Sequence, residues 1–176
     1  MSKKVAFLVA HEGIERVELT DPWERVTEAG YHPILVSLEP GTVQTFDHLD
    51  EAEKRDVDAV VADVAVEDFV ALVLPGGVAN PDALRTDETA VQFVARFLAS
   101  GKPVAAICHA PWTLVEADAV RGKTLTSWPS LKTDIINAGG SWVDQEVVVD
   151  GNLITSRNPD DLPAFTAALI TALTPA

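Results

Sequence analysis

Cysteine is almost absent from this chain. The 176 residues include a single Cys, at position 108. An intramolecular disulfide and a Cys-rich metal cluster are therefore both excluded. No pair among the four His residues has the spacing of metal ligands. We therefore expect neither a metal nor a cofactor.

Basic residues are scarce as well. The chain has 13 Lys and Arg against 27 Asp and Glu, a net charge of −14 at pH 7, and no basic run. A protein that binds duplex nucleic acid by charge needs basic side chains to release counterions from the phosphates. Binding to nucleic acid is therefore not expected, and the acidity favours solubility.

Long apolar segments are also missing. No apolar stretch approaches the roughly 20 residues that span a bilayer. The apolar run over residues 5–10 is short and leads to His11 and Glu12 rather than to a cleavage site, so no secretory signal is indicated. We expect a cytoplasmic protein with no membrane attachment. A chain of 176 residues with 47% hydrophobic residues suits one domain, residues 1–176.

What the chain does contain is an alternation of short apolar runs and amphipathic segments. Strands are predicted over residues 5–10, 32–38, 69–74, 104–107, 125–127, 146–149 and 153–156. Helices are predicted over residues 22–29, 86–100, 111–118, 131–138 and 159–173. Residues 39–67 are less regular, with short strands expected at 43–46 and 57–61. This order predicts an α/β fold: a mostly parallel sheet with helices on both faces.

Three loops follow predicted core strands: residues 11–18, 75–82 and 108–112. In a parallel sheet the strands end at one edge, where ligands bind. We therefore expect the three loops to meet there.

Cys108 begins the third of these loops. At a strand-to-helix turn, unpaired backbone N–H groups and the helix dipole favour the thiolate and lower the thiol pKa. The competing interpretation is a buried Cys that ends a core strand, and spacing alone divides the two about evenly. His109 follows directly, and it is either a partner of the sulfur or a capping or interface residue that points away.

The other two loops supply candidate partners. Gly76 and Gly77 could aim N–H groups at an oxyanion, or they could form an ordinary turn. The loop over residues 11–18 carries three carboxylates, any of which could reach Cys108 or simply face water; they are Glu12, Glu15 and Glu18. His32 and His48 are expected to lie away from the site.

Four stretches of sequence resemble the ThiJ/PfpI family, and within it the PfpI-type branch of intracellular proteases and general stress proteins. They are residues 72–77 (LVLPGG), 101–111 (GKPVAAICHAP), 126–140 (TSWP to INAGG) and 146–162 (EVVVDGN to SRNPDDL). The resemblance covers nearly the whole chain. It implies a flavodoxin-like three-layer sandwich within the class I glutamine amidotransferase-like group.

The resemblance also assigns roles to residues. The family's reactive Cys corresponds to Cys108 and its neighbouring His to His109. The family's loop Glu, which hydrogen-bonds the Cys, corresponds best to Glu15, with Glu12 as the alternative because the loop is longer here by about one residue. Family members form dimers and often hexamers, in which a carboxylate from a neighbouring subunit orients the His. That position corresponds to Asp82.

These observations lead to a cysteine-dependent hydrolase or lyase. Cys108 would attack a carbonyl carbon, the N–H groups of Gly76, Gly77 and His109 would hold the oxyanion, and His109 and Glu15 would move protons. The resemblance implies methylglyoxal or glyoxal adducts as substrates (deglycase or glyoxalase activity) or glycated or peptide substrates. The absence of a specificity domain favours the small carbonyl.

Two alternative functions fit the same cysteine, and a third is excluded. A PfpI-type peptidase would use the same residues. A redox sensor or chaperone would use an oxidisable Cys108 without catalysis. A glutamine amidotransferase needs a His late in the chain, and none follows His109, so that activity is excluded.

Overall fold

The fold centres on a seven-stranded sheet. The computed structural model describes residues 3–174. The strand order is β11-β12-β8-β7-β1-β3-β6, and every neighbouring pair is parallel except β11 and β12. The strands are β1 (Lys4–Leu8), β3 (His32–Ser37), β6 (Ala59–Val60), β7 (Ala71–Leu74), β8 (Val104–Ile107), β11 (Val148–Asp150) and β12 (Leu153–Ser156). β11 and β12 pair antiparallel across a turn at Asp150 and Gly151, a dipeptide that favours tight hairpin turns.

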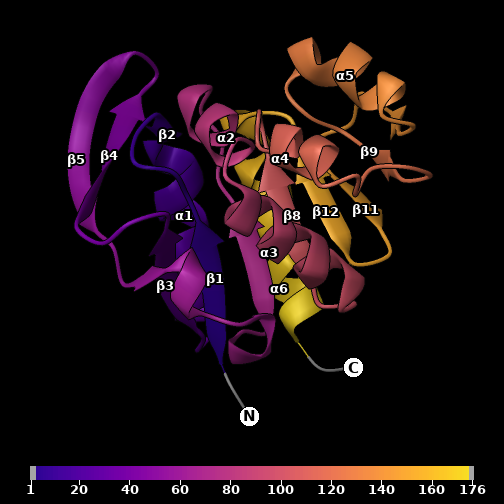
Figure 1. Cartoon of the computed structure of the whole chain (residues 1–176). Helices are drawn as coiled ribbons and strands as arrows, with labels where there is room; N and C mark the ends of the chain where they lie inside the picture. The colour runs from indigo at the N-terminus through magenta and orange to yellow at the C-terminus, as the bar shows by residue number, and fades with distance from the viewer. Residues whose placement is uncertain (1–2, 175–176) are drawn as a thin grey trace.

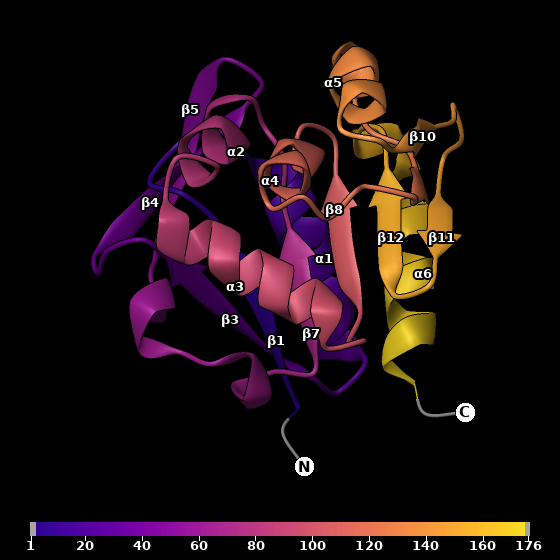
Figure 2. The ribbon, with the colours of Figure 1, turned by 45° about the vertical axis from the view of Figure 1, so that its right-hand side comes forward.

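The central strands are apolar along their whole length because helices cover both faces of the sheet. Alternate residues of β1 enter opposite cores: Ala6 and Leu8 pack into one, Val5 and Phe7 into the other. Helices α3 (Glu88–Ala99) and α4 (Pro111–Glu116) cover the first face, and α1 (Arg16–Glu28) and α6 (Leu162–Leu173) cover the second (Figure 2). The predicted α/β three-layer sandwich is confirmed.

The remaining elements stand mostly at one edge of the sheet. Figure 1 places the hairpin of β4 (Thr42–Asp47) and β5 (Asp50–Asp56) and the helix α5 (Lys132–Asn137) on the side where the parallel strands end. The hairpin pairs with β2 (Ile14–Glu15) in a separate three-stranded sheet. The other short elements are β9 (Thr124–Leu125), β10 (Ser141–Trp142), α2 (Ala79–Leu84), and the 3₁₀ turns η1 (Val61–Asp63), η2 (Val66–Asp68), η3 (Pro129–Leu131) and η4 (Pro159–Asp161).

Two sequence predictions at this edge were incomplete. The first helix begins at Arg16 rather than at Pro22, which lies inside it. Pro22 resembles a first helical residue, but the chain is already helical there. The strand β5 was not predicted, because its sequence DEAEKRD has no apolar alternation.

The sheet order brings the three candidate loops together, as predicted. β7 lies between β1 and β8, and Leu74 of β7 is in register with Ala106 of β8. Gly76 and Cys108 each follow two residues later, so they lie side by side at the strand ends. Within residues 3–174, no helix combines the length and apolarity needed to cross a bilayer.

Candidate active site around Cys108

Cys108 occupies a strained turn between β8 and α4. Its backbone φ is 64°, in the left-handed region that costs a non-glycine residue roughly 1–2 kcal/mol. Two backbone hydrogen bonds hold it there: its N–H donates to Ser156 O at 3.1 Å, and its carbonyl accepts from Trp128 N at 2.8 Å. Strain that the surroundings enforce is typical of functional positions. Of the two interpretations of Cys108, the geometry favours the nucleophile.

His109 does not point away from the sulfur. Its Nδ1 lies 3.2 Å from Cys108 Sγ, because the tight turn brings these adjacent side chains to the same side. The ring stacks on Trp128, with ring centroids 5.5 Å apart, and packs against Trp112. Burial lowers the pKa of His109 to about 4, so the imidazole is neutral at pH 7 and can donate or accept one proton at Nδ1.

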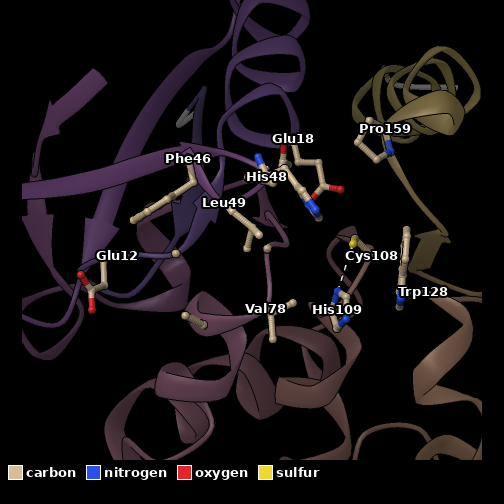
Figure 3. A pocket seen from close by; sticks show the side chains of 14 residues that line it. Glu12, Glu18, Phe46, His48, Leu49, Val78, Cys108, His109, Trp128 and Pro159 are labelled. Carbon is tan, nitrogen blue, oxygen red and sulfur yellow. Dashed lines mark hydrogen bonds between the residues drawn. The ribbon is translucent and has the colours of Figure 1, made fainter. Parts of the chain in front are cut away.

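Glu18 is the carboxyl group beside the sulfur. It lies in the first turn of α1, has no exposed surface, and accepts a hydrogen bond at Oε2 from Gly76 N at 2.9 Å. Figure 3 shows its side chain reaching from α1 toward Cys108. Burial, followed by the negative charge of Glu15, raises the pKa of Glu18 to about 8. Glu18 is therefore mostly protonated at pH 7.

The placement predicted for Glu15 was wrong. Glu15 is the residue just before α1, and its Oε2 accepts from the backbone N–H of His48 at 3.2 Å. Glu12 also lines the cavity, and Figure 3 shows it far from the sulfur. The assignment to Glu15 rested on the register of the loop with the family's pattern. With α1 beginning at Arg16, the inward-facing carboxylate of its first turn is Glu18.

The lowered thiol pKa that the sequence predicts is not found. Burial, followed by the charge of Glu18, raises the pKa of Cys108, while the backbone N–H groups of His109 and Gly77 act in the opposite direction. The helix behind the sulfur, α4, has six residues, so its dipole is weak. Protonation of Glu18 removes the repulsion and leaves a carboxyl that can donate to a thiolate.

Gly76 and Gly77 both lie in the loop beside Cys108, but their N–H groups have different roles. A Cβ on Gly76 would lie 2.7 Å from Cys108 Cβ, and a Cβ on Gly77 would strike Gly13 O, so neither position has room for a side chain. The N–H of Gly76 already donates to Glu18. The backbone N–H groups of Gly77, at φ 81°, and His109 face the sulfur, and these are the candidate donors to an oxyanion.

The buried side chain of Asn80 fixes the loop that carries these glycines. Its Oδ1 accepts from Ala10 N at 2.7 Å, at the end of β1, and its Nδ2 donates to the carbonyls of Pro75 and Gly76. One amide thus joins the ends of β1 and β7. Asn80 was not predicted as a site residue, because the sequence marks it only by a position three residues after the Gly pair.

Asp82 lies on α2, away from the sulfur. Its side chain is 57% exposed and forms an ion pair with Arg85 at 2.7 Å, and the Arg85 guanidinium lies over the ring of Trp112 at 4.6 Å. Among the residues described here, no hydrogen bond joins Asp82 to His109 of the same chain.

A cavity of about 620 Å³ opens over Cys108 (Figure 3). Its lining includes Glu18, His109 and Trp128, and on the opposite side Phe46, His48 and Leu49 of the hairpin. The prediction that His48 lies away from the site was wrong, because the unpredicted β5 folds the hairpin tip back over the strand ends.

Known proteins resemble this chain over nearly its full length. A putative cysteine protease of Bacillus subtilis, YraA, is 44% identical over 94% of this chain and 95% of its own. The deglycase PH1704 of Pyrococcus horikoshii is 47% identical over 92% and 94%. General stress protein 18 of Bacillus subtilis is 42% identical over 94% of both chains.

Solved structures of other proteins have the same fold as this chain. DJ-1beta of Drosophila melanogaster superposes with a TM-score of 0.88 at 32% identity, over 98% of this chain and 91% of its own. A two-domain protein of Anabaena variabilis with DJ-1/ThiJ/PfpI-like and ferritin-like domains gives a TM-score of 0.92 at 35% identity, over 98% of this chain and 48% of that one. The DJ-1/PfpI family model matches residues 3–172. The chain belongs to the DJ-1/PfpI family.

Proposed function

We propose that this protein is a cysteine-dependent enzyme that converts small carbonyl adducts, with methylglyoxal and glyoxal as the parent compounds. The observation that carries the proposal is the strained Cys108, whose sulfur lies 3.2 Å from a neutral His109 and beside a buried Glu18. Relatives named as deglycases support the same activity. A cytoplasmic location remains a prediction from the sequence.

The chemistry needs no external oxidant. The sulfur of Cys108 adds to the aldehyde carbon, and the resulting oxyanion accepts hydrogen bonds from the N–H groups of Gly77 and His109. Transfer of one proton from the first carbon to the second, through Glu18 or His109, oxidises the aldehyde carbon and reduces the ketone carbon. The proton that the Cys108 thiol gives up on attack passes by the same groups to the ketone oxygen, which becomes the hydroxyl of lactate. Water then releases lactate from the thioester and restores the thiol.

The direct test is lactate formation from methylglyoxal. The protein should form lactate, and Cys108→Ser should lower the rate by at least about a hundredfold, because the covalent route is lost. Equal lactate formation by the two proteins would refute the proposal.

We further propose that a neighbouring subunit completes the site with Asp82. In its own chain Asp82 is exposed and does not contact His109. A carboxylate supplied across an interface would orient the outer face of the imidazole, as the family resemblance implies for dimers or hexamers.

A peptidase is the second candidate. A relative at 44% identity is named a putative cysteine protease, and a cavity of about 620 Å³ has room for an amino-acid side chain beside the sulfur. Cleavage of a fluorogenic peptide that is abolished in Cys108→Ser would support it. A redox-sensor role for Cys108 stays a prediction that peroxide treatment and mass spectrometry would test.

A further inference from the structure

The tip of the β4–β5 hairpin forms a wall of the cavity over Cys108. Phe46, His48 and Leu49 line the cavity from this side, facing Cys108 and Trp128 across the opening (Figure 3). The tip comes from an element that contributes nothing to the reacting groups. Its contribution to the cavity is therefore in contacts with whatever part of a substrate lies beyond the carbonyl.

The opening of the cavity, of which the hairpin tip forms one side, is apolar and exposed. Leu49 is 82% exposed, Val78 57% and Trp128 38%, and all three line the cavity. They are half of the six large apolar side chains that are exposed among the described residues. Exposed apolar groups that gather at one opening indicate a binding surface.

The cavity is larger than the parent substrates require. A three-carbon dicarbonyl occupies on the order of 100 Å³, about three times the volume of a water molecule in the liquid. The cavity of about 620 Å³ lies within the range of roughly 300–1,000 Å³ that is typical of pockets for larger ligands. Most of the volume, and most of the apolar wall, would stay unused by methylglyoxal.

Two side-chain contacts hold the hairpin tip in place. Glu15 Oε2 accepts from the backbone N–H of His48 at 3.2 Å, and Arg16 Nε donates to Asp47 Oδ1 at 2.7 Å. These contacts anchor the tip to β2 and to the start of α1, the helix that carries Glu18. Glu15 is therefore a positioning residue for the wall.

We propose that the hairpin tip is the substrate-specificity wall of the Cys108 site, and that Leu49 selects carbonyl substrates with an apolar substituent, such as an aromatic 2-oxoaldehyde, over glyoxal and methylglyoxal. The inference rests on the proposed function for the identity of the electrophile. The selection itself follows from the position of the wall.

Kinetics with two substrates test the selection. The ratio of kcat/KM for phenylglyoxal to that for methylglyoxal should fall about 5- to 10-fold in Leu49→Ala, mainly through KM, as expected when a few buried methylene contacts are lost. Val149→Ala is the matched control, because Val149 is 59% exposed on β11 and does not line the cavity. It should leave the ratio unchanged. An unchanged ratio in Leu49→Ala overturns the proposal.

A second measurement does not depend on catalysis. Cys108 is the only thiol, so alkylation by N-phenylmaleimide and by N-methylmaleimide, each normalised to its rate with glutathione, reports access to this sulfur alone. The phenyl reagent should be favoured in the wild-type protein, and the preference should fall several-fold in Leu49→Ala. If no lactate forms but this preference and its loss are seen, the proposed function fails and the wall stands.

The oligomeric state of Leu49→Ala distinguishes a role of Leu49 in substrate selection from a role in a subunit interface. Light scattering should give Leu49→Ala the same mass as the wild-type protein. If the variant changes mass and regains the wild-type reagent preference when reassembled at high concentration, Leu49 acts through assembly and the proposal is overturned.

Discussion

Burial of Glu18 and His109 determines which side chains of the site are protonated. The carboxyl has no exposed surface and its pKa is about 8, while the neighbouring His109 is neutral because burial lowers its pKa to about 4. Near pH 7 the carboxyl of Glu18 is therefore mostly protonated and the imidazole of His109 is neutral. A proton can move between Glu18, the sulfur and Nδ1 without a net charge entering the buried site.

The shifted pKa values of Glu18 and His109 make the free energy of unfolding depend on pH. A carboxyl whose pKa is raised on folding stabilises the folded chain below its unfolded pKa of 4.5, and that stabilisation is lost as the pH rises through about 8. His109 acts in the opposite sense, because its contribution is lost only as the pH falls below 6.5. Between pH 6.5 and pH 8, therefore, the stability changes with the ionisation of Glu18 and not with that of His109.

We predict that the free energy of unfolding of the wild-type protein falls by about 2 kcal/mol more than that of Glu18→Gln between pH 6.5 and pH 8. Glutamine keeps the shape and the acceptor for Gly76 N but has no proton to lose. Urea denaturation at several pH values measures the difference. Parallel pH curves for the two proteins would contradict a raised pKa for Glu18.

At the scale of elements, two asparagines clamp opposite ends of the sheet. Asn80 joins the ends of β1 and β7 beside the site. Asn152, in the turn between β11 and β12, donates to Leu98 O and Lys102 O near the start of β8. Each asparagine gives hydrogen-bond partners to backbone groups that helices and strands leave unpaired, buried ones at Asn80 and part-buried ones at Asn152. Only Asn80 holds the loop that carries Gly77.

We predict that Asn80→Ala lowers the free energy of unfolding by roughly 2–4 kcal/mol, because buried N–H and C=O groups lose their partner. It should also change the rate at which Cys108 reacts with a maleimide. Asn152→Ala should lower stability without changing that rate. A rate that changes equally in both variants would show that Asn80 acts through stability alone.

Elements with a clear apolar pattern could be predicted, and those without one could not. The buried strands and the turn at Asp150 and Gly151 follow from short apolar runs and turn residues. The polar strand β5 and the start of α1 carry no such signal, since β5 is held by pairing with β4 and α1 begins before a proline. The unpredicted β5 hid the position of His48 and Leu49 over the site, and the late helix start hid the inward orientation of Glu18.

At the scale of the whole molecule, the parallel sheet collects the site from distant parts of the sequence. The order β8-β7-β1 brings Cys108, the Gly76–Gly77 loop and Glu18 to one edge. That convergence could be predicted from topology alone. The proposed contact of Asp82 with His109 would cross from one subunit to another, so its test needs the assembly.

Mixed assemblies test whether Asp82 acts across an interface. Cys108→Ser and Asp82→Ala should each have low activity in lactate formation. When the two variants are unfolded together and refolded, about a quarter of the wild-type activity should return, because random pairing restores intact sites in mixed dimers. If Asp82 acts within its own chain, the mixture will show no more than the sum of the separate variants.

The left-handed backbone at Cys108 has a consequence for laboratory evolution. A φ of 64° suits glycine better than any other residue, so the nucleophile sits at a position where a neutral replacement would relax the chain. Selection for heat resistance alone would therefore favour loss of the thiol. A screen for thermostable variants therefore has to select for catalytic activity in every round. Otherwise it will enrich more stable proteins that have lost the Cys108 thiol.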